Sequence, residues 1–136
     1  MLLVETYINI SPGIGIGLFA KVKIAKETKY WIRNELFDKV ISQVQLQSLE
    51  KIASDYFMKY GFFEKSGNWY LCGDHARFSN HSKSPNTRNH FNENGLLQYC
   101  TTSKIINANE EILIDYTEIC LTCRDGVNFS DILMSL

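Results

Sequence analysis

The stretch Arg77-Phe78-Ser79-Asn80-His81-Ser82-Lys83-Ser84-Pro85-Asn86 decides how the rest of the chain is interpreted. It is polar, it follows neither the period of a helix nor that of a strand, and it is rich in side chains that form hydrogen bonds. Such a composition favours a loop with a fixed backbone path. Its meaning depends on two other stretches, residues 13–20 near the start of the chain and residues 110–116 near its end.

The length and composition are those of one globular domain. The chain has 136 residues, of which 45% are hydrophobic and 21% are charged, so it can bury a core and is not disordered throughout. A net charge of −1 gives no sign of nucleic-acid or membrane binding through bulk electrostatics. We therefore expect no direct nucleic-acid partner and no membrane association.

The sequence also bears on the compartment. No apolar run approaches the roughly 18 to 20 residues of a membrane span, and residues 1–4 are too short for the core of a signal peptide. The four cysteines are scattered in a chain with an ordinary core, which favours reduced thiols over a disulfide scaffold. We expect an intracellular, cytoplasmic or nuclear protein without a signal peptide. The cysteines are Cys72, Cys100, Cys120 and Cys123.

Many short strands are predicted, because β-branched and alternating residues recur between turn signals. These strands cover residues 4–10, 22–24, 28–32, 69–72, 105–106 and 112–114, and a hairpin around Gly95 joins Phe91 to residues 96–102. The glycine-rich stretch 13–20 by itself indicates a turn between two strands. Its glycines would also let a ligand approach the backbone closely, because no Cβ stands in the way.

One substantial helix is predicted in the middle of the chain. Ser42 and Gln45 have the spacing of a capping box. Apolar residues then recur at three- and four-residue steps over residues 46–60, and Gly61 is placed to end the helix. With the strands, this predicts a β-rich α+β domain.

Cys120 and Cys123 have the spacing of a metal or redox pair. A structural zinc needs four ligands, and no second pair lies at metal spacing nearby, so we expect no metal. A redox pair normally opens a helix in an α/β unit, which this is not. Two unlinked thiols are expected, and a redox or metal protein is a distant alternative.

Taken together, three motifs resemble those of the SET domain, the fold of S-adenosylmethionine-dependent protein-lysine methyltransferases. The stretches, in chain order, are Gly15-Ile16-Gly17-Leu18-Phe19-Ala20 (G-x-G-L-F-A in the family), Ala76 to Ser82 with Pro85-Asn86 (R-F-x-N-H-S…P-N), and Asn107 to Tyr116 (A-G-E-E-L-x-x-D-Y). The match covers about residues 5–117, which we take as the domain. Residues 118–136 would be a short C-terminal tail over the active site. The layout is similar to compact stand-alone SET proteins of bacteria and viruses.

The resemblance implies a fold of small curled β-sheets with one main inserted helix and a C-terminal pseudoknot, in which a segment threads beneath a preceding loop. The threading would bring Asn80 and His81 beside Asp115 and Tyr116. In the family the cofactor lies in a cleft on one face, and the target lysine enters a narrow channel from the other.

The resemblance also implies transfer of a methyl group from S-adenosylmethionine to a lysine of a protein or peptide, such as a histone tail, with S-adenosylhomocysteine as product. Tyr116 matches the catalytic tyrosine, whose hydroxyl lines the transfer pore. Asn80 would bind the methionine part of the cofactor through its amide, and His81 would bind the adenine through its backbone. The full set of implied cofactor contacts is Gly15, Ile16, Gly17, Leu18, Asn80, His81 and Tyr116.

Some residues depart from the family pattern. Lys83 stands where a zinc-binding cysteine is common, so we expect no zinc. The tail at 121–129, or a partner subunit in a homodimer, would then close the lysine channel. Thr101-Thr102 leaves the degree of methylation open. The alternative function is a catalytically inactive SET-like interaction module, against which the intact Gly15, Gly17, Asn80, His81 and Tyr116 argue.

Overall fold

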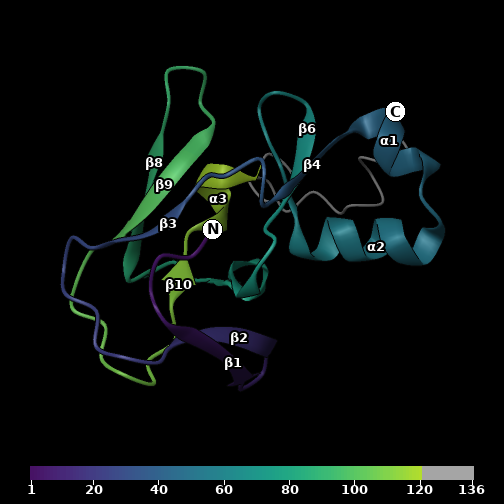
Figure 1. Cartoon of the computed structure of the whole chain (residues 1–136). Coiled ribbons are helices and arrows are strands. Elements are labelled where there is room, and N and C mark those ends of the chain that lie inside the picture. Colours follow the sequence, from purple (N-terminus) through teal and green to yellow (C-terminus); the bar gives the residue numbers. More distant parts are fainter. Residues whose placement is uncertain (121–136) are drawn as a thin grey trace.

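The computed structural model describes residues 1–120, which form four small β-sheets flanked by short helices (Figure 1). This confirms the β-rich α+β arrangement. The sheets are β1 (Thr6–Ser11) with β2 (Gly15–Ala20); β3 (Lys29–Ile32), β9 (Leu97–Thr102) and β8 (Thr87–Phe91); β4 (Lys39–Ser42), β6 (Asn68–Leu71) and β5 (Phe62–Phe63); and β10 (Leu113–Ile114) with β7 (Asn80–His81). The helices are α1 (Gln43–Ser48), α2 (Lys51–Tyr60), the 3-10 helix η1 (His75–Phe78) and α3 (Tyr116–Ile119).

The glycine-rich stretch forms a strand, so its interpretation as a turn is wrong. β2 pairs antiparallel with β1 in the register Ile10 to Ile16, and the turn between them contains Gly13 at φ +78°. Apolar residues alternate with the glycines along β2, which suits a pleated strand. The strand predicted at residues 22–24 is also absent, because only Ile24 pairs there, in an isolated bridge with Ile106.

The single predicted helix is two helices, α1 and α2. The capping box of Ser42 and Gln45 is present, and Gly61 follows the last turn of α2, as predicted. The break falls at Leu49, whose backbone is extended at φ −74° and ψ 152°. The apolar pattern predicts one continuous buried face, which the structure does not have. The side chain of Leu46 is 1% exposed, whereas that of Ile52 is 87% exposed. The helices therefore bury separate short faces.

Two clusters of buried side chains form the core. The larger one joins the β2 strand to the β3–β9–β8 sheet through side chains such as Leu18, Trp31 and Cys100. The smaller one packs Leu46 of α1 and Phe57 of α2 against Trp69 of β6. The helices thus cover the β4–β6–β5 sheet, while the β1–β2 hairpin lies apart from them, at the lower edge of Figure 1.

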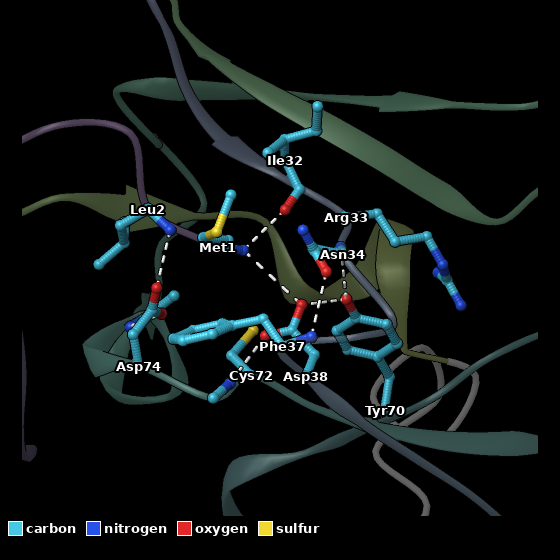
Figure 2. Close-up of polar contacts among 12 residues, drawn as sticks. Met1, Leu2, Ile32, Arg33, Asn34, Phe37, Asp38, Tyr70, Cys72 and Asp74 are labelled. Atoms are coloured by element: carbon cyan, nitrogen blue, oxygen red, sulfur yellow. Dashed lines mark hydrogen bonds and ion pairs between the residues drawn. The ribbon is translucent and has the colours of Figure 1, made fainter.

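The first residues of the chain pair with β3 through an isolated bridge between Leu2 and Trp31, and Met1 lies in a polar network around the buried Asp38 (Figure 2). The Met1 ammonium donates to the Ile32 carbonyl at 2.7 Å and lies 3.7 Å from Asp38 Oδ2. The fully buried Asp38 carboxylate also accepts from the Tyr70 hydroxyl and, at 2.8 Å, from the Gly73 amide. One carboxylate thereby joins the N-terminal segment, the turn before β4 and the end of β6.

The segment after residue 110 returns to the polar loop. β10 pairs parallel with β7, with Leu113 opposite Asn80 and Ile114 opposite His81. Asn86 holds this arrangement by donating to the Glu111 carbonyl and accepting from the Leu113 amide. The expected proximity of residues 80–81 and 115–116 is therefore confirmed, and threading of the chain stays a prediction. Between residues 1 and 120, no helix is long and apolar enough to cross a membrane.

Candidate functional site

An open cleft of about 380 Å³ lies where β2, the end of α2 and the polar loop meet. Its walls come from residues 14–16, from residues 58–61, from residues 77–80 and from Tyr116. These four segments are far apart in the sequence. The cleft therefore depends on the parallel pairing of β7 with β10, which brings Tyr116 to the loop.

A second, narrow pocket of about 30 Å³ adjoins the cleft. It is lined mostly by apolar and aromatic side chains, among them Tyr30, Trp31 and Leu97. Tyr60, Arg77, Ser79 and Tyr116 line both spaces. Tyr116 thus lies where the open cleft meets the apolar pocket.

The orientation of Tyr116 is fixed from both ends of the residue. The Asp115 side chain caps the start of α3 by accepting from the Thr117 amide at 2.9 Å. The Tyr116 amide donates to His81 Nδ1 at 3.1 Å, and its hydroxyl donates to the Ser79 carbonyl at 2.9 Å. The hydroxyl hydrogen therefore points to Ser79, a residue that lines both the cleft and the apolar pocket.

The Asn80 amide presents an acceptor to the cleft. Its Nδ2 donates to the Ile16 carbonyl at 3.1 Å and to Glu111 Oε2 at 2.9 Å. Within residues 1–120, no donor is paired with its Oδ1. A ligand that offers an N–H or an ammonium group at this wall would satisfy that oxygen.

Glu111 supports the site, although it is not among the cofactor-binding residues that the resemblance implies. Its Oε1 accepts from Ser11 Oγ at 2.7 Å, and its Oε2 accepts from Asn80. A Cβ at Gly17 would lie 2.6 Å from that Oε2, so only glycine lets the carboxylate pack against β2. Gly15, by contrast, is open to space but has φ +125°, a conformation that other residues rarely adopt.

Only some of the predicted cofactor-binding residues line the cleft. Gly15, Ile16, Asn80 and Tyr116 line the cleft. The side chain of Leu18 is fully buried in the core, and its carbonyl accepts from the Ile112 amide. Gly17 is buried against Glu111, and His81 is exposed beside Tyr116. The roles of these residues toward a ligand stay predictions.

Arg77 braces the walls of the cleft. Its Nε and Nη2 donate to the Cys72 carbonyl at 3.0 and 2.7 Å, and its Nη1 donates to the Tyr56 hydroxyl at 2.9 Å. It therefore ties the end of β6 to α2. The sequence signalled Arg77 by its place in the polar loop, whereas Tyr56 carried no separate signal.

The apolar pocket contains acidic groups that stay neutral. Burial raises the pKa of the Cys100 thiol to about 12, and it also raises the pKa values of Cys72 and Tyr30 well above their ordinary ranges. All three groups line the pocket. These three side chains are therefore uncharged at neutral pH, and Arg77 is the charged residue among those that line the pocket.

In the described part of the chain, no group of three or more His, Cys, Asp or Glu side chains could hold a metal ion. Cys123 and the tail at 121–136 lie outside the described residues. The expectation of no zinc, and that of a tail packed over the site, stay predictions.

The SET domain family model matches residues 15–117, which span the glycine strand, the polar loop and Tyr116. The chain belongs to the SET domain family. No sequence among the curated proteins matches it.

Solved structures share this SET domain fold. One is a candidate histone methyltransferase of Plasmodium falciparum, which is 21% identical, with a TM-score of 0.57 over 85% of this chain and 95% of that chain. Another is a humanized mutant of the Polycomb Repressive Complex 2 of Chaetomium thermophilum bound to an inhibitor, which is 20% identical, with a TM-score of 0.64 over 87% of this chain. This chain spans only 15% of the length of that second chain.

Proposed function

We propose that this SET domain protein transfers methyl groups from S-adenosylmethionine to lysine side chains of a protein substrate. The observation that carries the proposal is the position of Tyr116 between the cleft and the apolar pocket. A cofactor in the cleft and the methylene chain of a lysine in the pocket would then meet at one hydroxyl group. Membership of the SET domain family supports the same reaction.

The cleft fits the methionine part of this cofactor. The Asn80 Oδ1 is an acceptor without a donor among the described residues, which suits the α-ammonium group. Gly15 has no atom within 4 Å of the place where a Cβ would stand, so a ligand can approach its backbone. A narrow apolar pocket, in turn, suits a neutral amine on an aliphatic chain, because a charged ammonium would lose its hydration there.

When bound, S-adenosylmethionine supplies a methyl group that its sulfonium charge has already activated. The residues of the site need mainly to align the lysine nitrogen with that methyl and to exclude water. The uncharged walls around Tyr30 and Cys100 would favour the neutral amine. The lone pairs of the Tyr116 hydroxyl and the Ser79 carbonyl would stabilise the positive charge as it passes to nitrogen.

A SET-like interaction module without catalysis is the alternative. The observation against it is that the orientation of Tyr116 is set by hydrogen bonds at both its amide and its hydroxyl. A binding surface alone has no need of an internal hydroxyl held between two spaces.

The proposal is tested by incubating the purified protein with S-adenosylmethionine carrying a labelled methyl group and with histones or cell lysate. We expect label on lysine residues, identified by mass spectrometry of the modified protein. The absence of labelled lysine in every mixture, from folded protein that binds the cofactor, would favour the interaction module.

A further inference from the structure

The Asn80 amide has only one orientation that its neighbours accept. Both partners of Nδ2, the Ile16 carbonyl and the Glu111 carboxylate, carry lone pairs and no hydrogen. A reversed amide would place Oδ1 against two oxygens. Ile16 can take one of the two amide hydrogens, and Glu111 takes the other.

The Glu111 carboxylate is itself held from several sides. Ser11, which is 3% exposed, donates to Oε1 at 2.7 Å. The missing Cβ of Gly17 makes room for Oε2, and the Glu111 carbonyl accepts from Asn86 Nδ2 at 2.8 Å. Asn80 is among the residues that line the cleft and Glu111 is not, so the carboxylate acts on the cleft through Asn80. It cannot swing away without breaking these contacts.

We infer that Glu111 is a positioning residue, which fixes the Asn80 amide so that Oδ1 is presented to the α-ammonium group of the methyl donor. The inference rests on the proposed function and adds a residue to it. The negative charge of Glu111, one hydrogen bond behind Asn80, also polarises the amide and makes Oδ1 a better acceptor for a cation. Glu111 thereby selects ligands that carry an amine without touching them.

The test compares two ligands, S-adenosylhomocysteine and its analogue with hydrogen in place of the α-amino group. Calorimetry gives the dissociation constant of each for the wild type, Glu111→Ala, Glu111→Gln, Asn80→Ala and the Asn80→Ala/Glu111→Ala double variant. We expect Glu111→Ala to raise the dissociation constant of S-adenosylhomocysteine about tenfold or more, which corresponds to the loss of one charge-assisted hydrogen bond. The dissociation constant of the analogue should change little. The double variant should bind no worse than Asn80→Ala, because the two residues act as one unit.

Glu111→Gln serves as the conservative variant. Its amide oxygen can accept from Asn80 Nδ2 while its Nε2 donates to Ser11 Oγ, so the orientation is kept and only the charge is lost. It should recover most of the affinity that Glu111→Ala loses. Equal weakening of both ligands by Glu111→Ala would mean a general structural role and would overturn the inference.

Two further outcomes are separable. If the wild type binds neither ligand, the proposed function fails, whatever Glu111 does. If Glu111→Ala does not fold, Ser11→Ala replaces it, because it removes the anchor of Oε1 and leaves Asn80 in place. Ser11→Ala should weaken the binding of S-adenosylhomocysteine more than that of the analogue without the amino group. An equal effect on the two affinities would again overturn the inference.

Discussion

At the scale of single residues, the site depends on where hydrogens point. Tyr116 and Asn80 each direct their hydrogens to protein acceptors, the first to the Ser79 carbonyl and the second to Ile16 and Glu111. The Asn80 Oδ1 is thereby left without a donor among the described residues, at the wall of the cleft that Tyr116 also lines. A site of this kind suits a cation and a developing positive charge.

The first prediction concerns the Tyr116 hydroxyl. We expect Tyr116→Phe to lower the rate of methyl transfer roughly 100-fold, the cost of removing one preorganised polar group, with cofactor affinity within a few-fold of wild type. Single-turnover assays and calorimetry measure the two effects separately. Tyr7→Phe is the matched control, because its hydroxyl bonds Asn109 outside the cleft. An unchanged rate in Tyr116→Phe would remove this tyrosine from the reaction.

The sequence could predict the residues of the site but only part of its geometry. The motifs placed Gly15, Asn80 and Tyr116 together, and all three line one cleft. They could not predict that Leu18 would turn into the core or that Gly17 would face Glu111, because side-chain direction in β2 follows from its register with β1. Nor does a motif show which hydrogen a side chain donates.

At the scale of secondary-structure elements, local sequence signals predicted where the helical region begins and ends better than they predicted whether it is continuous. The capping box at Ser42 and the stop at Gly61 are both where the sequence predicts them. The break at Leu49 carried no glycine or proline, and the apolar period continued through it to exposed residues such as Ile52. Tertiary packing against β6 overrides the local pattern there.

The capping box gives the second prediction. Ser42→Ala removes the acceptor of the Gln45 amide, 3.1 Å away, and should lower the free energy of unfolding by about 1 kcal/mol. Urea denaturation measures the change. Ser54→Ala in α2 is the control, because its exposed hydroxyl only bonds back to Lys51 O, and it should stay within about 0.5 kcal/mol of wild type. Equal effects of both substitutions would show that the cap contributes nothing.

At the scale of the whole molecule, buried polar groups join segments that small sheets alone would hold weakly. Asp38 connects Met1 with Tyr70 of β6 (Figure 2), and it also accepts from the Gly73 amide. Around the apolar pocket, neutral thiols and phenols sit among aromatic side chains. Both features link the stability of the domain to the charge state of buried groups.

The third prediction follows from the Asp38 network. In Asp38→Asn one amide oxygen replaces two carboxylate oxygens, so the Tyr70 hydroxyl or the Gly73 amide loses its buried acceptor, and the free energy of unfolding should fall by about 2 kcal/mol. Asp55→Asn is the control, since its pair with Lys51 is exposed and should be worth less than about 1 kcal/mol. Chemical denaturation of both variants gives the comparison. A loss in Asp38→Asn no larger than that in Asp55→Asn would contradict the structural role of the network.

The fourth prediction is loss of stability at alkaline pH. The Cys100 thiol has a pKa of about 12 in the folded protein and an ordinary value of 9.0 in the unfolded chain. Between these values the unfolded chain releases a proton that the folded protein keeps, so the stability present below pH 9.0 is lost as the pH rises toward 12. Burial of Cys72 and Tyr70 acts in the same direction. Urea denaturation at a series of pH values should show the decline, and Cys100→Ala should make it shallower; a flat profile would contradict it.

The central claim is that the cleft of this SET domain binds S-adenosylmethionine. Calorimetric titration of the purified protein with S-adenosylmethionine tests it most directly. The account predicts saturable binding at one site, weakened by Asn80→Ala by roughly 1 to 3 kcal/mol, the cost of a lost buried hydrogen bond. The absence of any binding signal at high cofactor concentration, from protein shown to be folded, would contradict this claim.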